Sequence, residues 1–340
     1  MPHPYPVREI ARQAGVSEAT VDRVLHKRPG VRAGTILQVE QAIADLDRQR
    51  TQLRLSGRTF MVDVVMDTPN RFSRLVRESL EAELPGLRPA AIRARFHLRE
   101  GWPPDDLVAT LDSVAAKGSH GIILKAPDTP AVAAAIDRVT AAGVPILTLV
   151  TDVPASNRIA YVGMDNRAAG STAAYLMSQW LRHSDAAVLV MTSRNFFRGE
   201  EEREMGFRVA IRAKDACRRV VEISDTDGLD DTSRVLVADE LTRSPDIRAV
   251  YSIGGGNSGI LDAFAAAGRE CEVFIGHDLA QENRALLQTG HLTAVLHHDL
   301  REDMRHAARS IMMFHGALPG TVRTVRSKID VITPHNMPGR

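Results

Sequence analysis

The sequence is poor in cysteine and in aromatic residues, and it contains no long hydrophobic run. Its two cysteines, Cys217 and Cys271, are too few for a disulfide framework or a thiolate metal site. No apolar stretch approaches the roughly 20 residues that a membrane-spanning helix requires. The first residues, MPHPYPVREIARQ, lack the apolar core and cleavage site of an export signal. We therefore expect a cytoplasmic protein without a membrane partner.

The sequence also lacks the common catalytic and metal-binding motifs. It has neither a G-x-S-x-G elbow nor a P-loop. His291, His297, His298, Asp299 and His306 lie near one another in sequence, but not at the spacing of a zinc motif. The sequence therefore predicts no enzyme, no metal site and no cofactor.

One motif favours an enzyme. Gly254, Gly256 and Gly259 form a literal G-x-G-x-x-G after an apolar run, and Asp278 follows about twenty residues later, as in dinucleotide-binding turns. An NAD-linked oxidoreductase is therefore an alternative. The motif lies near the end of the chain, however, whereas such a fingerprint usually sits on the first βαβ unit. The glycines are better explained by close approach of the backbone to a small ligand.

The charge is unevenly distributed. Residues 1–58 hold ten Lys/Arg against six Asp/Glu, a net charge of +4, and the remaining chain holds 33 against 36, a net charge of −3. A basic amino-terminal segment on a mildly acidic body indicates that only this segment meets a polyanion.

The basic segment has the pattern of a helix-turn-helix unit. A first helix containing Val7, Ile10 and Ala11 stops at Gly15, and Ser17 caps a second helix. A third helix is predicted over residues 35–46. In such units the second helix enters the major groove of DNA. The alternative is a three-helix bundle without a nucleic-acid role.

The segment VREIARQAGVSEATVDRVLHKRPGVRAGT resembles the headpiece of the lac-repressor family of bacterial transcription regulators. The resemblance implies double-stranded operator DNA as partner, with Glu18, Ala19 and Arg23 reading bases and Ser17 and Thr20 touching phosphate. His26 lies on the same exposed helix face. Asp22 stands where the family more usually has a small hydroxyl residue. Its carboxylate either accepts a hydrogen bond from a cytosine amino group or forms a local ion pair with Arg8, Arg12 or His26.

The linker over residues 47–58 also departs from the family. Members of the family join headpiece to body through a hinge helix introduced by a Tyr-x-Pro turn, and a leucine of that helix wedges into the minor groove. Here the segment DLDRQRTQLRLSGRTF lacks this turn and is about two residues short. Leu55 is the first candidate for the wedge and Leu53 the second.

The body over residues 59–340 has an α/β pattern. Nine short apolar runs alternate with helical patterns such as 73–84, 105–116 and 130–142, which favours parallel sheets. Nine strands are many for one sheet, so we expect two lobes. The first lobe is expected over about 59–180 and 299–320, and the second over about 181–298 and 321–333.

Ligands of such sheets bind beyond the carboxyl ends of the strands. The candidate segments, each just after a predicted strand, are 67–72, 125–128, 151–152, 165–166, 193–203, 254–258, 277–278 and 298–299. They are rich in Asp, Asn and Arg, with Phe72, Phe196 and Phe197 nearby. This mixture suits a sugar, which needs polar groups for its hydroxyls and an aromatic face for its C–H side.

The body resembles ribose-binding-protein-like effector domains, above all in GVPILTLVTDVPASNRIAYVGMDNRAAG and in EEREMGFR. The resemblance implies an effector between the lobes, a sugar, polyol or sugar acid. The implied binding residues are Phe72, Asp152, Asp165, Asn166, Phe197, Arg203, Asn257, Asp278 and His298. Asp165 and Asp299 could instead only cap helices, and Phe196 or Phe197 could be a loop anchor.

These observations predict a homodimeric transcription regulator, and a repressor is expected, whose operator affinity a bound effector controls. A solute-binding protein of a sugar transport system is the other alternative. The lack of a signal peptide and the basic amino-terminal segment speak against it.

Overall fold

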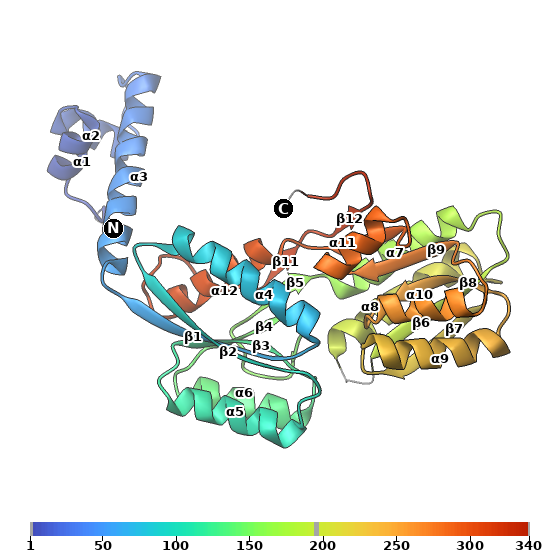
Figure 1. Cartoon of the computed structure of the whole chain (residues 1–340). Coiled ribbons are helices and arrows are strands. Elements are labelled where there is room, and N and C mark those ends of the chain that lie inside the picture. Colours follow the sequence, from blue (N-terminus) through green and yellow to red (C-terminus); the bar gives the residue numbers. More distant parts are fainter. Residues whose placement is uncertain (1–2, 194–196, 339–340) are drawn as a thin grey trace.

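The computed structural model describes residues 3–193 and 197–338, and it shows a helical headpiece beside two α/β lobes (Figure 1). The headpiece comprises α1 (Val7–Ala14), α2 (Glu18–Leu25) and α3 (Ala33–Leu55). The helix α1 ends at Gly15, which has the left-handed φ of 66° that favours glycine. The Ser17 hydroxyl accepts a hydrogen bond from the Thr20 amide at 3.2 Å and caps α2. The predicted helix-turn-helix architecture is confirmed.

The third helix is longer than predicted. It continues past Leu46 to Leu55 and so includes most of the predicted linker. No glycine or proline interrupts this segment before Gly57, and its Leu, Arg and Gln residues favour helix. The hydroxyl of Tyr5, which is buried in the headpiece core, donates to Asp47 at 2.5 Å. Leu55 belongs to the core of the first lobe. One continuous helix therefore joins the two cores.

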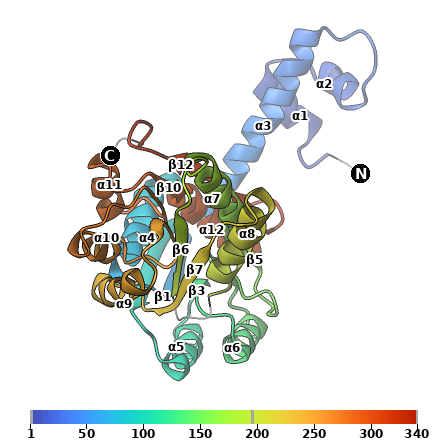
Figure 2. The same ribbon diagram turned by 90° about the vertical axis from the view of Figure 1, so that its right-hand side faces the viewer.

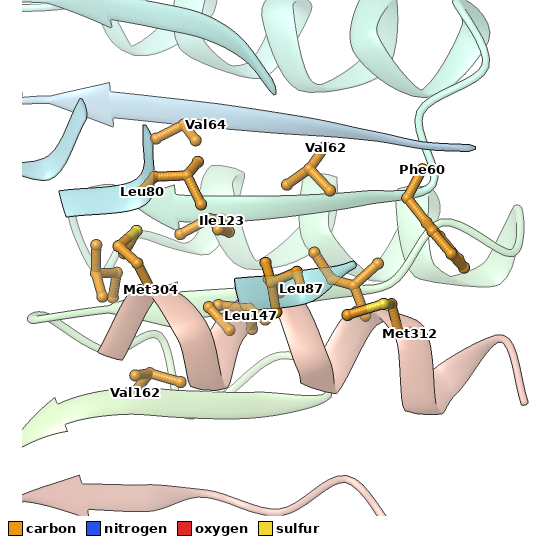
Figure 3. Packing of buried hydrophobic residues seen from close by; sticks show 14 of the residues in the cluster. Phe60, Val62, Val64, Leu80, Leu87, Ile123, Leu147, Val162, Met304 and Met312 are labelled. Atoms are coloured by element: carbon orange, nitrogen blue, oxygen red, sulfur yellow. The ribbon is translucent and has the colours of Figure 1, made fainter. Parts of the chain in front are cut away.

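The first lobe is a parallel sheet with helices on both faces. Its strands, in sheet order, are β11 (Val325–Ser327), β5 (Ala160–Met164), β4 (Ile146–Leu149), β3 (Gly121–Lys125), β1 (Thr59–Asp67) and β2 (Ala91–Arg99). The helices are α4 (Asn70–Glu83), η1 (Leu84–Leu87), α5 (Pro104–Ala116), α6 (Pro130–Ala141) and α12 (Leu300–Phe314). Figure 3 shows Met304 and Met312 of α12 packed against strand residues such as Val62 and Leu147. The opposite face packs on α5 and α6.

The second lobe repeats this arrangement. Its strands, in sheet order, are β12 (Asp330–Ile332), β10 (Ala294–His297), β9 (Val273–His277), β8 (Ile247–Ser252), β6 (Ala187–Ser193) and β7 (Val220–Thr226). Only β12 runs antiparallel to its neighbour. The helices are α7 (Asn166–Trp180), α8 (Arg198–Lys214), α9 (Asp230–Arg243), α10 (Asn257–Ala266) and α11 (Gln281–Gln288). Figure 2 shows α7 and α8 on one side of the strands and α9 and α10 on the other.

The chain crosses between the lobes three times. The crossing after β10 lies at the predicted boundary between residues 298 and 299, and the other two lie differently. The helix α7, predicted in the first lobe, packs its buried alanines on the second. The strand β11, predicted in the second lobe, pairs with β5 in the first. The strand β5 itself was not among the nine predicted strands. The chain therefore crosses after β5, after β10 and between β11 and β12.

Glycine explains why α7 joins the second lobe. A Cβ atom at Gly170 of α7 would overlap the carbonyl of Arg203, and one at Gly206 of α8 would overlap the carbonyl of Arg167. The two helix backbones therefore touch, which only glycine permits.

This contact predicts a large stability effect. Gly170→Ala should lower the free energy of unfolding by about 1–3 kcal/mol, because the added methyl group overpacks two backbones. Gly86→Ala is the matched control, since no atom lies within 4 Å of its new Cβ. Denaturant unfolding of both variants checks this, and equal stability of the two would contradict the packing argument.

Candidate functional site: a DNA-binding headpiece and an inter-lobe cleft

The exposed face of α2 carries most of the predicted DNA contacts. Ser17, Glu18, Ala19, Arg23 and His26 are exposed, while Val21 on the other face is buried. The half-buried Thr20 shares a hydrogen bond of 2.8 Å with the Ser17 hydroxyl. These side chains are therefore accessible to an external partner.

Asp22 and Leu55 are placed otherwise. The carboxylate of Asp22 forms an ion pair of 3.0 Å with Arg28 and lies 3.0 Å from His26 Nδ1, so it has local partners in place of the Arg8 or Arg12 pairing that the sequence also allowed. Leu55 is 5% exposed in the core of the first lobe and cannot reach DNA in this arrangement. Leu53, the second candidate for the wedge, is 78% exposed.

A pocket lies between the two lobes, where the carboxyl ends of both sheets meet. Five of the nine predicted effector residues line it: Phe72, Phe197, Arg203, Asn257 and Asp278. Phe196 lies outside the described residues. The other four predicted residues, Asp152, Asp165, Asn166 and His298, do not line the pocket.

Arg203 is the central cation of this pocket. Its side chain is buried, and its Nε donates to Asn166 Oδ1 at 2.8 Å. Asn166 donates in turn to the Val150 carbonyl at 3.0 Å, so it orients Arg203 and does not face the ligand space. Arg203 Nη2 has no hydrogen-bond partner among the described residues.

Asp152 and Asp165 have structural partners. Asp152 pairs with Arg158 and accepts from the Thr148 hydroxyl at 2.7 Å. Asp165 caps α7 through the Ala168 amide at 3.0 Å and pairs with Arg326 at 2.6 Å. Both carboxylates therefore make structural contacts near the point where the chain first crosses from the first lobe to the second.

His298 is fully buried behind the pocket. Its Nδ1 lies 2.5 Å from Asp303, and its Nε2 lies 4.0 Å from Asp278 Oδ1. The Ser327 hydroxyl donates to the other oxygen of Asp303 at 2.5 Å. His298 thus links the pocket residue Asp278 to the crossing strand β11.

Several buried polar atoms around the pocket have no partner within residues 3–193 and 197–338. Among the lining residues they are Arg203 Nη2, Asn257 Oδ1, His277 Nδ1, Asp278 Oδ1 and Ser193 Oγ. Buried polar groups are nearly always satisfied, so their convergence on one pocket marks a place for a polar ligand. Burial lowers the pKa of His277 well below its usual value, which keeps its imidazole neutral.

Asn257 and Asp278 are held in place by neighbouring groups. Asn257 Nδ2 donates to Asn283 at 2.7 Å, and Asn283 donates to the carbonyls of His277 and Asp278. Asp278 has a φ of 64°, a strained conformation for a residue other than glycine. This network leaves the Oδ1 atoms of Asn257 and Asp278 without a hydrogen-bond partner among the described residues.

The glycine-rich loop is explained by packing. A Cβ at Gly259 would overlap the carbonyl of Asp230, and one at Gly256 would overlap the Ser233 hydroxyl, so both glycines let α10 approach α9. A Cβ at Gly255 would overlap Arg71, which donates to the Gly254 carbonyl at 3.3 Å from across the cleft. The loop thus accommodates a first-lobe arginine, and these contacts account for the glycines without a bound nucleotide.

Sequence reasoning missed part of the lining. Arg71, Lys125, Thr151, Ser193, Glu200 and His277 fell within the candidate segments but were not singled out. Asp227, which directly follows β7, lies in none of the candidate segments. Asn283 lies inside α11, where no strand end could indicate it.

Lys125 is a buried cation in the pocket. Its Nζ donates to the Asp67 carbonyl at 2.9 Å and lies 3.6 Å from the ring centre of Phe197. Burial lowers the pKa of Lys125 to about 8, against the attraction of Glu200, Asp67 and Asp278.

The comparisons with known proteins agree with this organisation. Residues 7–49 match the family described as bacterial regulatory proteins, lacI family, and residues 64–314 match the periplasmic binding protein domain. No curated protein matches the chain. Among the described residues, no helix is both long and apolar enough to cross a membrane.

Solved structures share the fold of the body. A glucose-galactose binding protein from Geobacillus stearothermophilus superposes with a TM-score of 0.72 at 23% identity, covering 83% of this chain and 100% of its own. A protein assigned as a LacI transcriptional regulator from Bacteroides fragilis superposes with a TM-score of 0.73 at 15% identity, covering 82% and 98%. The headpiece and the two-lobed body together define a DNA-binding regulator with a sugar-binding type of domain. The chain belongs to the lacI family of bacterial regulatory proteins, with a periplasmic-binding-protein domain as its body.

The pKa of Lys125 predicts a pH-dependent contribution to stability. Between about pH 8 and 10.5 the unfolded chain keeps a proton that folded Lys125 has lost, so the stability of the wild type rises with pH relative to Lys125→Met. We expect a relative gain of about 1–2 kcal/mol between pH 7.5 and 9.5. Denaturant unfolding of both proteins at the two pH values measures it, and an unchanged difference would contradict the low pKa.

Proposed function

We propose that this protein is a cytoplasmic, homodimeric repressor whose affinity for its operator is set by a small polyhydroxylated effector bound between the lobes. The observation that carries the proposal is the convergence of unsatisfied buried polar atoms on the inter-lobe pocket. They include both donors and acceptors, as vicinal hydroxyl groups require. Several of the matched structures are described as binding sugars, among them glucose-galactose, arabinose and fructose. No catalytic step is proposed.

The proposed effector contacts come from the second lobe and from the aromatic walls. Arg203 donates to a ligand oxygen, and the Oδ1 atoms of Asn257 and Asp278 accept from ligand hydroxyls. Phe72 and Phe197 line the pocket as apolar faces. Asn166 and His298 act through Arg203 and Asp278, which they contact or face.

Contacts across the cleft supply the means of regulation. Arg198 of the second lobe pairs with Asp128 of the first at 3.4 Å, and the Gly199 amide donates to the Thr151 hydroxyl at 3.0 Å. An effector that binds this arrangement better than a more open one shifts the equilibrium between them. Because α3 ends in the first-lobe core, a shift of that lobe reaches the headpiece.

DNA recognition is proposed for the exposed face of α2. Arg23, Glu18 and Ala19 face bases, and Ser17, Thr20 and His26 contact the DNA backbone or its groove. Two headpieces on a two-fold dimer would bind a palindromic site. Leu53 replaces Leu55 as the residue available for a minor-groove contact.

The two halves of the proposal predict separable defects. Arg23→Ala should weaken selective binding to operator by about tenfold or more, since one base contact is worth about 1–3 kcal/mol. It should leave effector binding unchanged. Arg203→Met should abolish effector binding and leave operator binding intact.

The operator is obtained by selection from genomic fragments at about 150 mM salt with competitor DNA, since salt sets non-specific affinity. Arg182→Ala, an exposed position in the body, is the control for Arg23→Ala. Unchanged operator affinity in Arg23→Ala would rule out the assigned recognition helix. A loss of operator binding in Arg203→Met without effector would rule out the assigned effector site.

A further inference from the structure

The two walls of the inter-lobe pocket carry opposite charge. Among the described residues of the first lobe, the charged side chains that line the pocket are Arg71 and Lys125, and no carboxylate or side-chain amide does. The second lobe contributes Arg203 together with the carboxylates of Glu200, Asp227 and Asp278. A ligand between the walls therefore meets two different chemical surfaces.

The first-lobe wall can mainly donate hydrogen bonds. Lys125 uses one of its three protons on the Asp67 carbonyl, and Arg71 makes one long bond of 3.3 Å to the Gly254 carbonyl. The Thr151 hydroxyl oxygen already accepts from the Gly199 amide. What remains is donor capacity on two cations, one of them deeply buried, beside the hydroxyl groups of Thr68 and Thr151.

The second-lobe wall offers acceptors that suit hydroxyl groups. Two of its carboxylates already have local partners, since Asp227 accepts from the Leu229 amide and the Thr232 hydroxyl, and Glu200 accepts from the Ser193 amide. Asp278 Oδ1 and Asn257 Oδ1 have no partner among the described residues, and Arg203 Nη2 lies near them as a donor in the same pocket.

We propose that the effector is a polyhydroxylated carboxylic acid, of the aldonate or uronate type, with its carboxylate against Arg71 and Lys125 and its hydroxyls on Asp278, Asn257 and Arg203. This inference rests on the proposed function and names the chemical class of its ligand.

Whether the pocket prefers an acid or a neutral sugar depends on the hydrogen-bond donors and acceptors that the first-lobe wall offers. A hydroxyl placed there can accept from the cations, but its own proton finds no side-chain carboxylate or amide on that wall, and an unsatisfied buried group is costly. A carboxylate only accepts, and it forms stronger charge-assisted hydrogen bonds with both cations. A phosphate ester carries up to two negative charges, which the three carboxylates of the opposite wall repel.

The first test compares matched ligands on the full-length protein. Isothermal titration calorimetry is run with galactose, galactonate and galacturonate, with glucose, gluconate, glucuronate and glucose 6-phosphate, and with myo-inositol. We expect at least one acid to bind tenfold or more tightly than its neutral partner.

The outcomes separate the inference from the proposed function. A neutral sugar, inositol or phosphate ester that binds as tightly as the matched acid or more tightly overturns the acid assignment and leaves the proposed function standing. If none of these compounds binds, both the proposal of a polyhydroxylated effector and the assignment of that effector as an acid are contradicted.

Variants of the first-lobe wall identify the carboxylate subsite. Arg71→Met and Lys125→Met should each reduce the ratio of acid affinity to neutral affinity at least tenfold. Arg74→Met is the matched control, because Arg74 is exposed on the same helix as Arg71, α4, and does not line the pocket. It should leave the ratio unchanged. An equal loss of both affinities in the two wall variants would mean that they only shape the pocket, which contradicts the assignment. Circular dichroism of each variant checks that it is folded.

The pH dependence gives a second readout. Above about pH 8 Lys125 loses its charge in the free protein, so affinity for the acid should fall as the pH rises from 7.5 to 9.5. The charged groups that face Lys125 are Glu200, Asp67, Asp278 and Arg203. The fall should be absent in Lys125→Met, and the same fall in that variant would overturn the role of Lys125.

Discussion

The close contact between α7 and α8 determines how the residues of the proposed effector site are placed. Gly170 and Gly206 let the two backbones touch. That contact sets Asn166, at the first crossing between the lobes, against Arg203. Arg203 is thereby fixed, and its Nη2 has no partner among the described residues although it belongs to a pocket with other unsatisfied polar atoms. A ligand that satisfies them is bound by groups oriented in advance, which reduces the entropy lost on binding. The same residues hold a crossing segment, so site and lobe arrangement are coupled.

The headpiece is joined to the body by a different route from the one that the family resemblance implies. Tyr5 fastens the start of the predicted linker to the headpiece core through Asp47, and Leu55 fastens its end to the first lobe. The helix α3 spans both attachments without a break. Because the helix α3 reaches from the headpiece core to the first-lobe core, no flexible segment separates them among the described residues. The orientation of the headpiece therefore follows that of the first lobe. Absence of the Tyr-x-Pro turn in the sequence agrees with this continuity.

The sequence predicted most of what is local and little of what depends on contacts between distant elements. The turn at Gly15 and the cap at Ser17 follow from neighbouring residues, and they were predicted. Arg203, Asn257 and Asp278 were found because they follow strands or match a family motif. Asp165 and Asn166 were assigned to the ligand because sequence cannot show that one caps a helix and the other holds Arg203. The lobe of α7 depends on a contact between helix backbones, and Asn283 reaches the pocket from a helix interior.

The central claim is that cleft and headpiece are thermodynamically coupled, and reciprocity tests it most directly. If an effector changes operator affinity by some factor, the operator must change effector affinity by the same factor. The measurement is calorimetric titration of the effector into the protein, free and saturated with its selected operator. We expect the two effector affinities to differ by about fivefold or more, by the same factor as the change in operator affinity that the effector causes. Identical effector affinity with and without operator would show that the pocket does not control DNA binding.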